Sequence, residues 1–360
     1  MFLAVSDRPW VLDGAMVHVS IIGFDDGSEQ SRTLNGEAVQ QINPDLSSGT
    51  DVTRARILRE NAGIAFMGDS KGGAFELTDT AAQEMLLRTN PDGRSNRDVI
   101  RPWANGKDVN GRPRNRWIID FGVDCSREEA ALYEAPFAHV ESLVKPERAS
   151  NKRQKYRERW WLHAEARPGM RRALHGLQRF LVTVRHAPHR LFTWLPAATL
   201  PDSALIVFAI DDDYRFGVLQ SMVHLAWAKA QVSQVRDADS GARYTRASAF
   251  GKFPFPHPTS QQRSVIAAEA ARLHELRQGW LYAPTTTGQE SIGRTLTRLY
   301  NLRPQWLSDV HERLDGAVLA AYGWPRSAPD EAVVSRLTEL NLTREAGAEE
   351  DVDDAVIDDQ

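Results

Sequence analysis

The chain has 360 residues, of which 42% are hydrophobic and 26% charged, values that are ordinary for a globular protein of two or three domains. It contains no apolar run of about eighteen residues, so we expect no membrane-spanning helix, and its start lacks the basic leader of a secretory signal. The single cysteine, Cys125, excludes an internal disulfide and predicts a reducing, cytoplasmic location.

The first segment, residues 1–40, has the pattern of β-strands. GAMVHVSIIGF alternates apolar and polar residues, the following Asp-Asp-Gly signals a turn, and RTLNGEAV predicts a returning strand. Two or three strands cannot bury a core of their own. We therefore expect them to complete a larger domain, and exposure of the apolar side chains there, Val17, Val19 and Ile21, would indicate a missing partner.

The second segment, residues 41–257, mixes both kinds of element. The β-like runs GIAFMGD, RWIIDFG, RFLVTVR and ALIVFAID alternate with predicted helices at 78–88 and 126–143. Thr78 or Asp79 caps the first helix, and Ser126 caps the second with a glutamate three residues on. Stretches rich in Gly, Asn and Pro, such as PWANGKDVNGRP, predict loops.

The third segment follows the double proline step FPFP, which cannot continue a helix or a central strand and so predicts a domain boundary. Residues 258–344 are predicted to be helical. Residues 345–360 carry eight acids and no base, a composition that predicts a disordered acidic tail. The fold class expected for the chain is α+β.

Positive charge is concentrated in two blocks. Residues 145–190 hold thirteen Lys or Arg against three acids, and residues 88–116 hold eight against three. Tyr156, Trp160 and Trp161 lie within the first block, and cations interleaved with aromatic residues are typical of a nucleic-acid surface. The alternative is that the arginines are a solvated helix face and that Trp160 and Trp161 anchor the core. We expect the tryptophans to be core residues and the cations to be functional.

Catalytic signatures are missing from the sequence. GDSKGG at 68–73 has the wrong spacing for a phosphate-binding loop, and neither GxGxxG, GxSxG nor HExxH occurs. His186 and His189 in HAPHR indicate a polar turn, and no metal site is predicted. The pair Asp108 and Asp120 lacks the acid-x-lysine that a nuclease carries. We therefore predict no catalytic residue in this chain.

Several stretches, in a fixed order, resemble the target-recognition domain of the MmeI-like type IIG/IIL restriction–modification DNA methyltransferases. They are RPWANGKDVNGRPRNRWIIDFG, KPERASNKRQKYRERWW, RFLVTVRHAPHRLFTWL, LIVFAIDDDYRFGVLQSMVHLAW and RYTRASAFGKFPFP. HERLDGAVLAAYGWP with RLTELNLTRE is similar to that family's C-terminal helical region, and GAMVHVSIIGF to the last strands of its class I methyltransferase domain. The resemblance implies terminal strands of a truncated methyltransferase domain at 1–40, a mixed α/β target-recognition domain at 41–257 and a C-terminal helical domain at 258–344.

The catalytic half of that family carries a glycine-rich cofactor loop and an Asn-Pro-Pro-Tyr/Phe motif that holds the flipped adenine. Neither occurs here, since NPDL and NPDG share only the first two letters. The resemblance thus implies the DNA-recognition portion of a SAM-dependent adenine-N6 methyltransferase that is inactive alone. This chain would bind no cofactor, S-adenosylmethionine belonging to the complete enzyme, and its partners would be double-stranded DNA and a separate catalytic chain.

Two other interpretations stay open. In the first, the chain is a stand-alone DNA-binding specificity protein or a degenerate remnant without enzymatic activity. In the second, it is a scaffold whose basic face binds an acidic protein or its own acidic tail. The β segment at 1–40 distinguishes a stand-alone binder from the recognition portion of a methyltransferase, because a stand-alone binder does not need strands that complete the sheet of another domain.

Phosphate contacts set the register of a protein on DNA, and base contacts specify the sequence. Within this resemblance, the predicted phosphate contacts are Lys145, Arg148, Lys152, Arg153, Lys155, Arg157 and Arg190. Arginine and asparagine make bidentate contacts to base edges. The predicted base-reading residues are Arg101, Asn105, Lys107, Asn110, Arg112 and Arg114.

Overall fold

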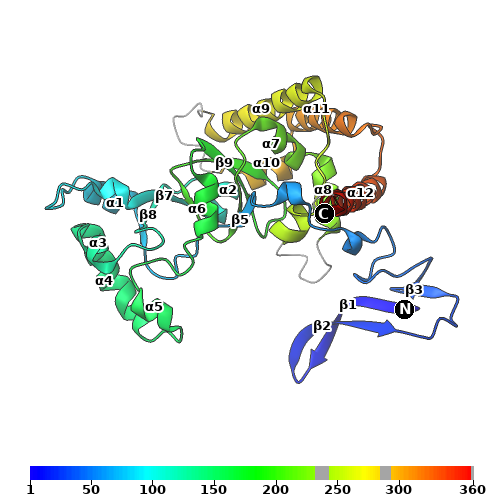
Figure 1. Ribbon diagram of the computed structural model, residues 1–360, viewed down its shortest axis with the longest axis horizontal. Coiled ribbons are helices and arrows are strands. Elements are labelled where there is room, and N and C mark those ends of the chain that lie inside the picture. The colour runs from blue at the N-terminus through cyan, green and yellow to red at the C-terminus, as the bar shows by residue number, and fades with distance from the viewer. Residues whose placement is uncertain (232–242, 284–292, 358–360) are drawn as a thin grey trace. The chain divides into compact units, whose positions relative to one another are not determined.

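The computed structural model describes residues 1–231, 243–283 and 293–357, with side chains up to Arg344 (Figure 1). The chain divides into two compact units. Unit 1 comprises Met1–Ala62, Val218–Val265 and Arg313–Gln360, and unit 2 comprises Gly63–Gly217 and Ile266–Glu312. Each unit combines helices with small sheets, so the predicted α+β class is confirmed.

Unit 1 contains a four-stranded sheet in the order β2-β1-β3-β4, which confirms that residues 1–40 form strands. The first two strands form a long antiparallel hairpin whose turn residues Asp13 and Gly14 have φ of +49° and +82°, the backbone of a type I′ turn. The elements of unit 1 are β1 (Leu3–Leu12), β2 (Ala15–Gly23), β3 (Arg32–Leu34), β4 (Glu37–Val39), the 3₁₀ turns η1 (Val52–Arg54) and η2 (Arg59–Asn61), α8 (Met222–Ala230), the π-helical turn η4 (Arg246–Phe250) and α12 (Asp330–Ile357).

Two buried asparagines join distant segments of unit 1. The side-chain amide of Asn61 donates to the carbonyl of Phe253 at 2.8 Å. Asn341 on α12 donates to the carbonyls of Arg56 (2.8 Å) and Lys252 (2.7 Å), and it accepts from the Arg56 amide at 2.8 Å. These bonds satisfy backbone groups that are buried around Asn61 and part-buried around Asn341. They therefore tie the chain around Arg56 to the segment around Lys252 and to α12.

These contacts explain why the predicted boundaries at residues 40 and 257 both lie inside unit 1. The predicted disorder of the acidic tail, residues 345–360, stays a prediction. Helix α12 continues to Ile357, and residues 358–360 lie outside the described part of the chain. A helix that is already nucleated gains one hydrogen bond for each residue it adds, and the alanines and glutamates of this segment favour helix.

Unit 2 contains two four-stranded sheets, with strand orders β10-β9-β12-β5 and β11-β7-β8-β6. All pairs are antiparallel except β7 with β11. The elements of unit 2 are β5 (Ala65–Met67), β6 (Glu76–Leu77), α1 (Asp79–Leu86), η3 (Asn96–Asp98), β7 (Ile100–Ala104), α2 (Gly106–Asn110), β8 (Arg116–Ile119), α3 (Arg127–Ala131), α4 (Glu134–Ala149), α5 (Gln154–Glu158), α6 (Pro168–Leu174), β9 (Arg179–Val184), β10 (Phe192–Pro196), β11 (Leu200–Pro201), β12 (Leu205–Phe208) and α10 (Leu296–Leu302). Helices α7 (Asp213–Gln220), α9 (Ser260–Tyr282) and α11 (Gln305–Tyr322) pass from one unit to the other.

The helix starts predicted in unit 2 are confirmed. Thr78 accepts from the Ala81 amide at 3.2 Å and caps α1. Ser126 and Glu129 form a reciprocal capping box at the start of α3. The helix expected over 126–143 is instead two helices, because α3 ends at Ala131 and α4 begins at Glu134.

The core of unit 2 lies between the strands and α4. Ile118 of β8, Phe180 of β9 and Val140 of α4 are fully buried within it. Trp160 is 5% exposed and packs in the same core, with Trp161 edge-on at 5.8 Å. The interpretation of Trp160 as a core residue is therefore confirmed.

Within residues 1–231, 243–283 and 293–357, no helix combines the length and the apolar character needed to cross a membrane.

Candidate nucleic-acid interface

The part of the 145–190 block that holds residues 145–157 lies on unit 2, on the C-terminal end of α4, on α5 and on the linker between them. Lys152, Arg153, Lys155 and Arg157 of the predicted phosphate contacts are exposed there. Lys145 is also exposed, with an ion pair to Glu141 at 2.8 Å. Five of the seven predicted phosphate contacts thus stand on one stretch of surface, and their role as phosphate contacts stays a prediction.

Arg148 is different, because it is only 2% exposed. Its guanidinium donates to the carbonyls of Lys71 (2.7 Å), Gly72 (3.0 Å) and Leu162 (2.7 Å). Burial lowers the pKa of Arg148, since the charged form loses its water. The side chain joins α4 to two other segments of unit 2. This burial contradicts the predicted phosphate contact of Arg148.

Arg190 lies in the loop between β9 and β10, two residues before β10 begins, and is half-buried. Its Nη1 donates to the Thr183 hydroxyl at 3.2 Å and to the Val184 carbonyl. These bonds hold the Arg190 side chain against the end of β9. Arg190 is therefore less accessible than the five exposed cations, and its phosphate contact stays a prediction.

The segment expected to be a base-reading loop contains the short helix α2. The Asn105 side chain accepts from the Lys107 amide at 2.9 Å, and the Asp108 carboxylate accepts from the Asn105 amide at 2.9 Å. Arg114 closes the other side with two bonds of 3.0 Å to Asp108. Burial raises the pKa of Asp108, but the hydrogen bonds from Arg114 and Asn105 outweigh it, and the pKa is lowered overall. The side-chain oxygen of Asn105 and the guanidinium of Arg114 thus stabilise α2.

Three other predicted base-reading residues differ in how exposed they are. Lys107 is exposed, whereas Asn110 and Arg112 are half-buried. The Asn110 carbonyl accepts from the Thr297 hydroxyl of α10 at 3.2 Å, and Arg112 donates to the Leu281 carbonyl at 3.4 Å. Base reading by this set stays a prediction, and Lys107 is its most accessible member.

A buried ion network lies behind these surfaces. Arg171 on α6 pairs with Asp120 at 2.7 Å and with Asp69 at 2.9 Å. His163 places Nδ1 2.7 Å from Asp69 and Nε2 2.9 Å from the Ile119 carbonyl.

This network fixes the charge of Asp120. Burial raises the pKa of the Asp120 carboxyl, but the positive charges of His163 and Arg171 outweigh that effect and hold the pKa at about 2. Arg101 approaches the same carboxylate to 3.6 Å from a cleft of about 580 Å³, and its Nε donates to the Ala198 carbonyl at 3.1 Å. The Asp120 carboxylate therefore positions the guanidinium of Arg101, a predicted base-reading residue, in the lining of this cleft.

Sequence reasoning missed Asp69, His163 and Arg171. They come from three separate segments, and no local spacing relates them. Asp108 and Asp120, the two carboxylates without a nuclease motif, are each neutralised by an arginine, an arrangement that satisfies them without a metal. In the part of the chain that the structure describes, no three His, Cys, Asp or Glu side chains are grouped to hold a metal ion.

No protein-family model matches the chain. Over 146 residues, 40% of its length, it is 27% identical to DNA methyltransferase A of Bacillus subtilis (strain 168), of which this region makes up 15%. The fold is similar to the solved structure of the type IIL restriction–modification enzyme MmeI in complex with DNA, with a TM-score of 0.72 and 18% identity, over 96% of this chain and 46% of that chain.

The chain thus spans less than half the length of either protein. The structural likeness establishes the fold, and the sequence likeness relates a region of the chain to a DNA methyltransferase. The expected resemblance to MmeI is confirmed at this level.

Proposed function

We propose that this chain is the DNA-recognition portion of a SAM-dependent adenine-N6 DNA methyltransferase of a restriction–modification system. The observation that carries the proposal is the likeness over 96% of the chain to MmeI, an enzyme whose structure was solved in complex with DNA. The likeness of one region to a DNA methyltransferase points in the same direction.

The exposed cations of unit 2 support binding to double-stranded DNA. Lys152, Arg153, Lys155 and Arg157 stand within six residues of one another on the linker and on α5. Cations that neutralise DNA phosphates release condensed counterions, and this release makes binding strong at low salt. In this proposal these four side chains grip the backbone, while Lys107 and Arg101 face the bases.

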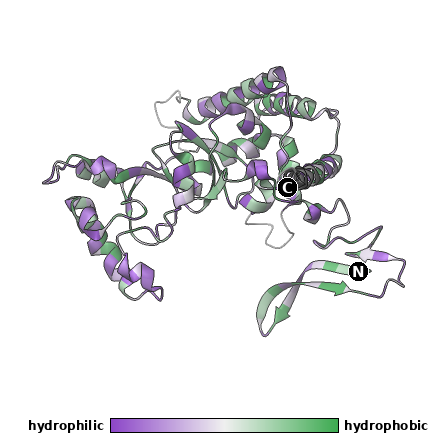
Figure 2. Ribbon diagram, viewed as in Figure 1, coloured by the Kyte–Doolittle hydropathy of each residue, from purple (hydrophilic) through white to green (hydrophobic). Residues whose placement is uncertain are grey.

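The hairpin of unit 1 supports a catalytic partner over a stand-alone binder. Its end carries Trp10, Val11, Leu12 and Met16, with side chains 53%, 65%, 59% and 82% exposed, and Figure 2 shows this hairpin as largely hydrophobic. Further along, Ile21 is 49% exposed, whereas Val17 and Val19 are partly covered. An apolar surface on a long hairpin is a liability in a free protein. We propose that it packs against the catalytic part, which would bind S-adenosylmethionine and supply the motifs that this sequence lacks.

The test is selection from a pool of random duplex DNA by the purified chain at two salt concentrations, followed by sequencing of the bound fraction. We expect binding that weakens steeply with salt, together with an enriched motif. No methyl transfer is expected when the chain alone is given S-adenosylmethionine and the selected DNA.

Two triple variants of equal charge locate the binding surface. K152Q/K155Q/R157Q removes exposed cations of unit 2, and the logarithmic salt slope should fall by about 2 to 3, at roughly 0.9 for each DNA phosphate that is no longer neutralised. R54Q/R56Q/R59Q removes exposed cations of unit 1 and should leave the slope unchanged. If the wild-type chain fails to bind duplex DNA even at low salt, the proposal is wrong.

A further inference from the structure

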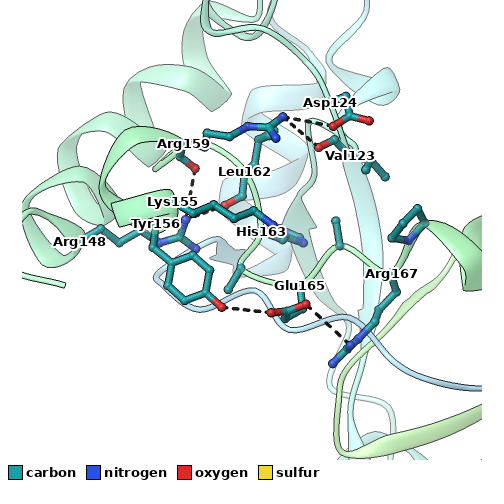
Figure 3. Close-up of a pocket in the computed structure, with 13 residues that line it drawn as sticks. Val123, Asp124, Arg148, Lys155, Tyr156, Arg159, Leu162, His163, Glu165 and Arg167 are labelled. Atoms are coloured by element: carbon teal, nitrogen blue, oxygen red, sulfur yellow. Dashed lines mark hydrogen bonds and ion pairs between the residues drawn. The ribbon is translucent and has the colours of Figure 1, made fainter. Parts of the chain in front are cut away.

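Beside the exposed cations, unit 2 contains a separate cavity of about 190 Å³ (Figure 3). Its inner wall is formed by the buried residues Leu162, His163 and Ala164, and Lys155, Arg159 and Arg167 stand around it. Pockets for drug-sized ligands occupy about 300–1,000 Å³, so this cavity favours a smaller group.

The charges around the cavity do not balance. Its two carboxylates are already paired, Asp124 with Arg159 at 3.3 Å and Glu165 with Arg167 at 3.8 Å, and Glu165 also accepts from the Tyr156 hydroxyl at 3.2 Å. Lys155 lines the cavity, is exposed, and makes no ion pair with any described residue. This lysine is therefore an uncompensated cation at the cavity.

A second uncompensated charge lies deeper in the wall. Arg148 is 2% exposed, and in the described part of the chain it is held by carbonyl oxygens and by no carboxylate. A buried charge is screened far less than a surface charge. Arg148 and Lys155 together make the cavity electropositive, and such a hollow concentrates anions.

Arg167 is held in place at a cost. Its backbone is left-handed, with φ of +53° and ψ of +62°, although it carries a full side chain. This conformation costs an arginine roughly 1 kcal/mol or more. The Nε of Arg167 donates to the Gly68 carbonyl at 3.1 Å, which fixes the guanidinium beside the cavity.

We propose that this cavity is a binding site for one phosphate group, with Lys155, Arg159 and Arg167 as its cationic ligands and Arg148 as the buried charge behind them. If the phosphate belongs to the DNA backbone, the inference rests on the proposed function. If it belongs to a small phosphate-bearing ligand, the inference stands without it. Asp124 and Glu165 border the site and pair with Arg159 and Arg167, so a bound phosphate would share these two arginines with them.

The probe is inorganic phosphate, compared with chloride at matched ionic strength, with thermal unfolding of the full chain and titration calorimetry as readouts. Phosphate should stabilise the wild-type chain above chloride, because a ligand bound only by the folded state raises its stability. Lys155→Gln should weaken phosphate binding by roughly tenfold, and Lys152→Gln, three residues away and outside the cavity lining, should not.

Arg167→Gly is a second variant that separates a loss of phosphate binding from a loss of folding. Glycine adopts the left-handed backbone without penalty, so this variant should keep or raise thermal stability while its phosphate affinity falls. If phosphate stabilises the chain no more than chloride, or if Lys155→Gln and Lys152→Gln bind phosphate equally, the inference is overturned.

Competition identifies the source of the phosphate. If phosphate lowers the affinity for duplex DNA more than chloride does in the wild type and not in Lys155→Gln, the site holds a backbone phosphate. If phosphate binds but DNA affinity is untouched, the site serves a small phosphate-bearing ligand. A chain that binds phosphate but no DNA would refute the proposed function alone, and a chain that binds DNA but no phosphate would refute this inference alone.

Discussion

A substitution at Arg148 tests whether this side chain stabilises the fold or binds DNA. Its guanidinium donates to five carbonyls, of Lys71 (2.7 Å), Gly72 (3.0 Å), Arg159 (3.5 Å), Trp160 (3.3 Å) and Leu162 (2.7 Å). Arg148→Met keeps most of the side-chain volume but leaves those acceptors without a donor. A buried group that loses its partner costs about 1–3 kcal/mol, and removing the buried charge offsets part of the sum. We therefore expect a loss of about 3–5 kcal/mol in the free energy of unfolding.

The assay is urea unfolding followed by tryptophan fluorescence, with Lys145→Met as the matched control. Lys145 lies one turn earlier on α4, with 47% of its side chain exposed, and its substitution should change stability by less than about 1 kcal/mol. Arg148→Lys should not restore stability, because one ammonium cannot reach carbonyls on several segments as a planar guanidinium does.

An Arg148→Met variant whose free energy of unfolding lies within about 1 kcal/mol of wild type would contradict this structural role of Arg148. A folded variant that lowers the salt slope of DNA binding by about 0.9, the change expected when one DNA phosphate is no longer neutralised, would contradict it as well. The second result would restore Arg148 to the predicted phosphate-binding residues.

Three further predictions concern unit 2 and the junctions of unit 1. Burial, and to a smaller extent the positive charge of Arg277, lowers the pKa of His311 to about 3. Because the side chain titrates near 6.5 in the unfolded chain, the free energy of unfolding should fall as the pH drops from 6.5 toward 3, by about 2 kcal/mol at pH 5. His311→Gln should remove this part of the pH dependence of urea unfolding. Asp120→Asn should cost about 3 kcal/mol, because it leaves the buried cations of its network short of one negative charge; an unchanged melting temperature would contradict this. Asn341→Ala removes the buried side chain that pairs three part-buried backbone groups and should cost about 1–3 kcal/mol in thermal unfolding followed by calorimetry; Thr343→Ala, exposed on the same helix, should be nearly neutral in that measurement.

The sequence by itself determined the features that depend on neighbours along the chain. The strands of residues 1–40, the caps at Thr78 and Ser126, and the core position of Trp160 all follow from alternation, capping chemistry and side-chain size. The concentration of cations in 145–157 is likewise a property of composition, and most of these side chains are exposed.

Only the tertiary structure decided which of those cations are available. No local pattern separates Arg148 from Lys152, yet Arg148 is buried and donates to carbonyls 77 residues upstream, at Lys71, and 14 residues downstream, at Leu162. The network of Asp69, His163 and Arg171 and the junction made by Asn341 likewise join residues that are distant in the chain. Long-range polar contacts have no periodicity, so the local pattern carries no trace of them, and the folded chain alone brings the partners together.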